Sequence, residues 1–136
     1  MTAKEYLLKI EYYDDRIERD ESELERLYAC AYGNAALDYT KDKVTVSTDP
    51  GKIAEIVSLI EQFSDDKAKC ILERAKIIWA IQQIPNKEAA RIIYLRYVEY
   101  LKYPRMKYVE RITPMSKGTF YKYYNMGLDS VAQTLN

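Results

Sequence analysis

Residues 113–128 read TPMSKGTFYKYYNMGL, and this stretch decides the expected fold of the C-terminal part. The pair Thr113-Pro114 interrupts a helical pattern, and Ser116 is a residue type that caps helix N-termini well. Apolar positions then recur at helical spacing, at Phe120, Tyr124, Gly127, Leu128 and Val131. The sequence therefore predicts a turn followed by a helix that begins after Ser116.

The other face of this expected helix is short of acid and rich in groups that bond phosphates and base edges. A shorter helix, opened by Pro104 and running to about Ile112, precedes it, and the two together are typical of a helix-turn-helix. The candidate DNA-contacting residues of the second helix are Lys117, Thr119, Tyr121, Lys122 and Asn125. The candidates for holding the DNA backbone are Lys102, Arg105, Lys107 and Arg111.

Charge is distributed unevenly along a chain whose formal net charge is zero. Residues 1–66 hold 8 Lys/Arg and 16 Asp/Glu, a net of −8, whereas residues 67–136 hold 13 Lys/Arg and 5 Asp/Glu, a net of +8. This asymmetry favours contact of the C-terminal half with a polyanion. Attraction between the two halves explains it equally well.

Two long helices are expected before residue 85. Heptad-like apolar seams run through about residues 2–32 and 50–84, with a loop at 33–49 between them. Such helices are expected to form a long antiparallel, coiled-coil-like hairpin. Asp20 and Lys67 both occupy seam positions, which predicts that they pair, unless both extend into water. A further apolar stripe that includes Val57 and Leu59 predicts a homodimer.

Eight of the fourteen tyrosines fall between Tyr94 and Tyr124, interleaved with basic residues. We expect Tyr94, Tyr97 and Tyr124 to be structural, because a small helical domain needs bulky side chains in its core. Tyr121 is the tyrosine expected to reach DNA.

The residue types argue against an enzyme. The chain has no histidine and no Gly-rich phosphate loop, so we expect no catalytic residues, no metal ligands and no cofactor. No apolar run is long enough to span a membrane, and the polar N-terminus does not resemble a signal peptide. Cys30 and Cys70 would lie far apart along the hairpin and are expected to be free thiols, which fits a reducing cytoplasm.

The chain resembles a family of small phage and prophage proteins of Gram-positive bacteria. Members carry a C-terminal helix-turn-helix like region 4 of sigma factors, and are related in pattern to late-gene activators of the ArpU and RinA type. The resembling segments are residues 1–7, 42–44, 52–57, 94–99 and 116–128. The resemblance implies a cytoplasmic, DNA-binding transcription regulator in a bacterial host. Glu110 stands where the family usually has a small residue, and Pro114 where it usually has glycine.

The expected fold is all-α, with an acidic helical hairpin over residues 1–84 and a basic helix-turn-helix domain over residues 85–136. The expected function is transcriptional regulation, with the helix after Ser116 in the major groove of duplex DNA. Two alternatives remain open. One is a DNA-packaging recognition subunit of the small-terminase kind, and the other is a protein that binds host RNA polymerase without reading DNA.

Overall fold

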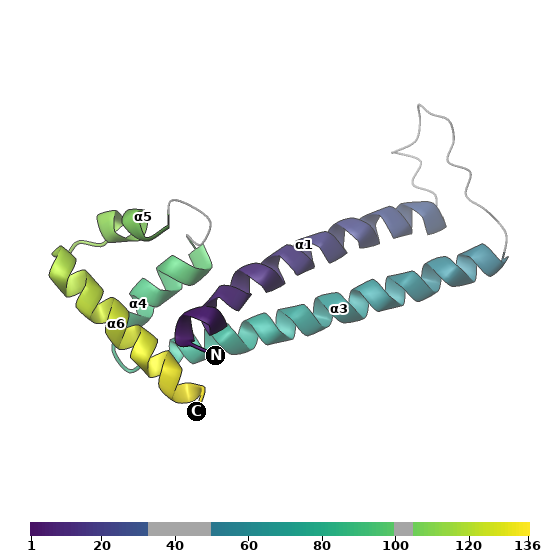
Figure 1. The fold of residues 1–136 in the computed structure, drawn as a ribbon. Coiled ribbons are helices and arrows are strands. Elements are labelled where there is room, and N and C mark those ends of the chain that lie inside the picture. Colours follow the sequence, from purple (N-terminus) through teal and green to yellow (C-terminus); the bar gives the residue numbers. More distant parts are fainter. Residues whose placement is uncertain (33–49, 100–104) are drawn as a thin grey trace. The chain divides into compact units, whose positions relative to one another are not determined.

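The computed structural model of the protein describes residues 1–32, 50–99 and 105–136, and every regular element in these ranges is a helix (Figure 1). The prediction of an all-α fold is confirmed. The elements are α1 (Ala3–Tyr32), α3 (Pro50–Gln82), α4 (Lys87–Tyr94), the π-helical segment η1 (Leu95–Glu99), α5 (Arg105–Ile112) and α6 (Lys117–Thr134). The loop expected at residues 33–49 lies outside the described residues.

Side-chain caps fix where α1 and α4 begin. The Thr2 hydroxyl accepts a hydrogen bond from the backbone N–H of Glu5 at 3.1 Å, and the Glu5 carboxylate accepts one from the N–H of Thr2 at 3.4 Å. This reciprocal capping box satisfies two N–H groups that the first helical turn leaves without partners. The Asn86 side chain caps α4 by accepting a hydrogen bond from the N–H of Ala89 at 3.0 Å.

The chain divides into two compact units. Unit 1 comprises Met1–Asp14 and Leu72–Asn136, and unit 2 comprises Asp15–Ile71. The limits of the units fall within the long helices α1 and α3, and the expected domain boundary after residue 84 coincides with neither of them. The first turns of α1 and the last turns of α3 therefore belong to the same unit as α4, α5 and α6.

One hydrophobic core holds unit 1 together. Its α1 and α3 members are Ala3, Leu7, Ile10, Ile77 and Ile81, and Ile84 follows the end of α3. Its C-terminal members are Ala89, Ile92, Ile93, Tyr97, Val109, Phe120, Tyr124 and Val131. Helix α4 packs against α6 and η1, and α5 packs against η1. The buried rings of Tyr97 and Tyr124 confirm the structural role expected of both, and Tyr94 packs against the same core.

A glycine sets the distance between α4 and α6. A Cβ atom added at Gly127 would lie 2.5 Å from Cγ1 of Ile93 and 3.2 Å from the carbonyl oxygen of Ala89. Both α4 residues are fully buried, so they have little room to move aside. The absence of a side chain at Gly127 therefore lets α6 lie directly against α4.

Two hydroxyls meet in the same core. The Tyr97 and Tyr124 hydroxyl groups are 2.7 Å apart and share a buried hydrogen bond between η1 and α6. Burial, followed by this bond, raises the pKa of Tyr97. The Arg96 guanidinium lies 4.8 Å from the centroid of the Tyr97 ring, a favourable cation–π distance.

In unit 2, ion pairs join the α1 and α3 segments. Arg16 pairs with Asp66, and Lys67 lies 3.7 Å from a carboxylate oxygen of Glu21. The predicted pair between Asp20 and Lys67 is therefore wrong. The Lys67 side chain stays 34% exposed beside a Glu21 side chain that is 55% exposed, so its ammonium group keeps water contact. A pair with fully buried Asp20 would have removed that water, at a high desolvation cost.

Candidate nucleic-acid interface

A short hydrogen-bonded turn joins α5 to α6. The Thr113 hydroxyl donates to the carbonyl of Val109 at 2.6 Å, and the Met115 N–H donates to the carbonyl of Thr113 at 2.8 Å. Thr113 is buried although it is polar, and its bond to the preceding helical turn satisfies its hydroxyl. The turn therefore has a defined geometry at the point where the sequence predicted a break.

Helix α6 begins at a cap made by Ser116. The Ser116 hydroxyl oxygen accepts a hydrogen bond from the Thr119 N–H at 3.3 Å and lies 2.9 Å from the Thr119 hydroxyl, to which it donates. The predicted cap at Ser116 is confirmed. Thr119 is exposed, and its hydroxyl accepts this bond from Ser116. Thr119, predicted to contact DNA, is therefore part of the cap of α6.

The two faces of α6 differ in the way that the sequence predicted. Its buried residues are Phe120, Tyr124, Gly127 and Val131. The exposed residues of its first three turns are Lys117, Gly118, Thr119, Lys122 and Asn125. The first turn contains no acidic residue, and the first acid along the helix is Asp129. The exposed start of α6 is thus positively charged and carries one amide side chain.

A basic hollow lies where α5, the turn and α6 meet. It has a volume of about 360 Å³ and is lined by Lys107, Glu110, Arg111, Met115 and Lys117. Three cationic side chains face one carboxylate there, so the lining carries a net positive charge. This hollow brings together two residues predicted to hold the DNA backbone, Lys107 and Arg111, with one predicted at the start of the reading helix, Lys117.

Glu110, the single acid of the basic hollow, is bound by Tyr121. The Tyr121 hydroxyl donates to Oε2 of Glu110 at 3.2 Å, which links α6 to α5. Burial, followed by the Glu110 carboxylate, raises the pKa of Tyr121. Tyr121 was expected to reach DNA, and the structure places its half-buried ring in edge contact with Phe120, with its hydroxyl on Glu110. Its hydroxyl therefore joins α6 to α5.

The remaining predicted residues are distributed as follows. Lys122 and Asn125 are exposed on α6, on the side opposite its buried residues. Lys102 lies outside the described residues, and Arg105 begins α5 with a side chain that is not described.

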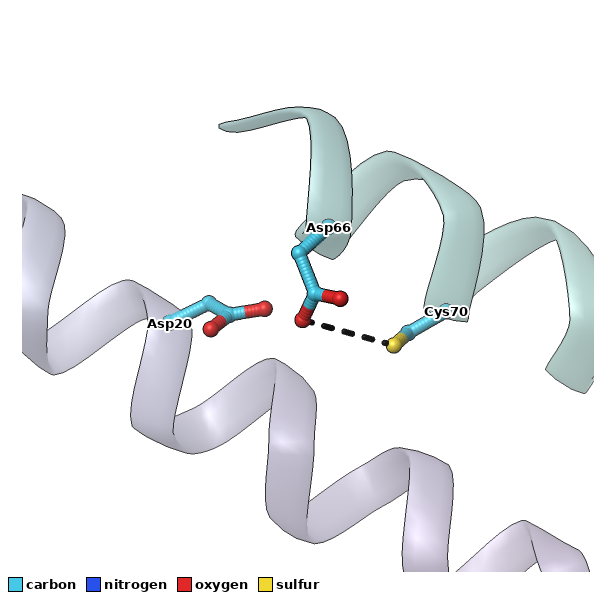
Figure 2. A group of neighbouring side chains, drawn as sticks. All are labelled: Asp20, Asp66 and Cys70. Atoms are coloured by element: carbon cyan, nitrogen blue, oxygen red, sulfur yellow. Dashed lines mark hydrogen bonds between the residues drawn. The ribbon is translucent and has the colours of Figure 1, made fainter. Parts of the chain in front are cut away.

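A cluster of ligand-type side chains in unit 2 was missed by the sequence analysis. Asp20 of α1 faces Asp66 and Cys70 of α3 (Figure 2). Burial, followed by Asp66, raises the pKa of Asp20, while the interaction with Asp20 and that with Arg16 lower the pKa of Asp66. Asp20 was recognised as a seam position, and a carboxylate at a seam was the available signal.

The two cysteines are free thiols, as expected, with Cys30 exposed and Cys70 buried. Among the described helices, none combines the length and the apolar character that crossing a membrane requires. Comparisons with protein-family models, with curated proteins and with solved structures find no match to this chain.

Proposed function

We propose that the chain binds duplex DNA through α5, the turn and α6, and that it acts as a transcription regulator of the phage type that the sequence resembles. In this proposal α6 enters the major groove, where Lys122 and Asn125 reach base edges. Lys107, Arg111 and Lys117 hold the phosphate backbone beside the groove.

The observation that carries the proposal is the position of the basic hollow next to the exposed start of α6. A reading helix needs phosphate contacts close to its N-terminus, because these contacts set its depth and register in the groove. Lys107 and Arg111 come from α5, whereas Lys117 is the first residue of α6. Cationic side chains from both helices therefore line a single hollow, where they can contact the same stretch of the DNA phosphate backbone.

The rigidity of the element supports the same proposal. The Ser116 cap, the Thr113 turn and the bond from Tyr121 to Glu110 each fix a different part of α5–turn–α6. Gly127 and the hydroxyl pair of Tyr97 and Tyr124 attach α6 to α4 and η1. A helix held in this way can present its side chains to DNA without a large ordering cost.

Self-association belongs to the same proposal. Ile53 and Val57, in the part of α3 that belongs to unit 2, are exposed apolar side chains, and Leu59 is half-buried. A homodimer through this stripe would cover these side chains, and a dimer carries two copies of α6, as recognition of two DNA half-sites requires. Contact of the stripe with host RNA polymerase is the alternative use of the same surface.

Selection of bound fragments from a random duplex library tests the proposal, with the full chain as bait. We expect enrichment of a common site, and we expect Lys107→Glu to abolish it. Lys87→Glu is the matched control, because Lys87 is also an exposed lysine, lies in the first turn of α4 and does not line the basic hollow. Enrichment that survives Lys107→Glu, or is lost equally in both variants, would refute the proposed interface. Failure of the wild-type chain to retain any duplex would favour a polymerase-binding protein.

A further inference from the structure

The cluster of Asp20, Asp66 and Cys70 has the composition of a metal site. Each residue offers one ligand atom, and these atoms all lie within 4.8 Å of one another. Asp66 and Cys70 are four residues apart on α3, so they project from the same face, and Asp20 meets them from α1 (Figure 2). All three belong to unit 2.

Asp20 is the residue that the surrounding structure leaves without compensation. Its side chain is 0% exposed, and neither carboxylate oxygen has a hydrogen-bond partner among the described residues. A buried carboxylate in this situation is strongly destabilising unless a cation, a proton or a set of hydrogen bonds compensates it. In Figure 2 one of its oxygens points toward the Asp66 carboxylate, which is hydrogen-bonded in turn to Cys70, so the compensating group belongs on this side of Asp20.

The neighbouring arginines do not provide that compensation. Arg16 is bound to Asp66 through two nitrogens, one of them at 3.3 Å. Arg19 approaches Asp20 only to 3.5 Å, with a side chain that is 57% exposed to water. Water screens the charge of an exposed guanidinium, so it offsets little of the cost of burying Asp20. Arg16 is bound to Asp66 and Arg19 is exposed, so neither arginine compensates the buried carboxyl group of Asp20.

We propose that Asp20, Asp66 and Cys70 bind a thiophilic divalent cation, with Zn²⁺ as the best chemical fit. Zinc accepts carboxylate oxygen and cysteine sulfur in the same site, whereas calcium and magnesium prefer oxygen alone. Ligand bonds of about 2.0–2.3 Å in a tetrahedral site put ligand atoms about 3.5 Å apart, so rotamer adjustments of about 1 Å close the cluster around the ion. Water supplies the fourth ligand.

The remaining groups of the cluster fit this use. A carboxylate has about four lone-pair positions, so Asp66 can accept from Arg16 and still bind a cation, with Arg16 orienting the ligand. The Cys70 Sγ lies 3.8 Å from Oδ2 of Asp66 and carries its proton in this arrangement. When the cation binds, the S–H bond of Cys70 breaks, the sulfur keeps the electron pair for the metal, and the proton passes to solvent. No oxidant or reductant takes part.

The ion would connect α1 to α3 at a point where their seam is polar. Cysteine and aspartate ligands from two helices would make the pairing of these segments depend on the cation. This role is independent of the proposed DNA interface, which lies in unit 1.

Cobalt is the spectroscopic probe for this site, because Co²⁺ takes the coordination geometry of Zn²⁺ and absorbs light. The full chain, treated with a chelator and a thiol reductant and then freed of both, is titrated with Co²⁺ and afterwards with Zn²⁺. We expect a thiolate-to-cobalt charge-transfer band in the near ultraviolet that saturates at one ion per chain and disappears when Zn²⁺ displaces it.

Three variants make the test specific. Cys30→Ser is the matched control and should keep the band, since Cys30 is the exposed cysteine outside the cluster. Cys70→Ser should remove the band. Asp20→Asn keeps the side-chain volume, and it should weaken Co²⁺ binding by at least about tenfold. Far-ultraviolet circular dichroism establishes that each variant remains helical, and Asp20→Asn carries the test if Cys70→Ser does not fold.

Three results would overturn the proposal. They are the absence of a charge-transfer band in the wild-type chain, a band that follows Cys30 instead of Cys70, and wild-type cobalt affinity in Asp20→Asn. The first and third results would mean that a proton shared by Asp20 and Asp66 compensates the buried charge.

Discussion

The contact of α6 with α4 gives a sharp prediction about a single methyl group. Gly127→Ala places a Cβ atom 2.5 Å from Cγ1 of Ile93 and 3.1 Å from its Cδ1. Real Cβ atoms do not approach another carbon this closely, so Ile93 or the helix must move. The carbonyl oxygen of Ala89, at 3.2 Å, restricts movement on the other side.

The magnitude follows from two opposing contributions. Replacing glycine by alanine in a helix interior stabilises by up to about 1 kcal/mol, because the unfolded chain loses freedom. Overpacking a filled core destabilises by about 1–3 kcal/mol. Gly118 is the matched control, since a Cβ atom there meets nothing within 4 Å and the residue lies in the same helix. Gly127→Ala should therefore be about 1–3 kcal/mol less stable than Gly118→Ala.

Urea denaturation followed by far-ultraviolet circular dichroism measures both variants against the wild type. We expect the midpoint of Gly118→Ala to equal or exceed that of the wild type, and the midpoint of Gly127→Ala to lie below that of the control. Equal stabilisation by both substitutions would mean that α6 does not lie against α4 as described, and the reasoning would be refuted.

Three other perturbations test different parts of the account. Tyr97→Phe leaves the Tyr124 hydroxyl buried without its partner, so it should destabilise the protein by about 1–3 kcal/mol in urea denaturation. The double variant with Tyr124→Phe should recover part of that loss. If the effects of the two substitutions are fully additive, the hydrogen bond between the two hydroxyls is contradicted. Val57→Lys should turn a dimer into a monomer in light scattering, and a wild-type chain that is already monomeric at micromolar concentration would contradict the proposed self-association. Lys107→Ala should reduce the slope of log affinity for DNA against log salt by about one unit, and an unchanged slope would remove Lys107 from the backbone contacts.

Local signals in the sequence predicted the helices well. Ser116 was recognised as a cap because its side chain can accept a hydrogen bond from a backbone N–H group at a helix start, a property that needs no tertiary context. The buried face of α6 followed from helical periodicity in the same way. These signals depend on residues within a few positions of each other, so they can be recognised in a single sequence.

Contacts between distant segments were predicted less well. The seam pattern placed Asp20 and Lys67 on the facing sides of their two helices, but it did not determine which residue of the other helix each would contact. In the structure Lys67 pairs with Glu21. Opposite charge alone favoured a pair between Asp20 and Lys67. The structure instead reflects the desolvation cost of burying the lysine ammonium group. The π-helical segment Leu95–Glu99 was also missed, because an added residue in a helical turn has no distinct local composition.

In the candidate interface, too, local features were predicted from the sequence and contacts between helices were not. Exposure of Lys117, Lys122 and Asn125 follows from the period of α6, and the sequence predicted it. The bond of Tyr121 to Glu110 depends on the angle between α5 and α6, which periodicity does not determine. A tyrosine on the border between the buried and the exposed face of a helix can point toward the core or toward solvent. Here the Glu110 carboxylate of α5 binds the Tyr121 hydroxyl and holds the ring toward α5.

The central claim is that α6 reads DNA sequence, and Asn125 tests it most directly. Asn125 is exposed on α6 and has an amide that can bond an adenine edge at two points. The measurement is a binding titration of the wild type and Asn125→Ala on the selected site and on a scrambled duplex of equal length, at fixed salt. The account predicts a loss of about 1–3 kcal/mol for Asn125→Ala on the selected site and little change on the scrambled duplex. An equal loss on both duplexes, or no loss on either, would contradict the assignment of α6 as the reading helix.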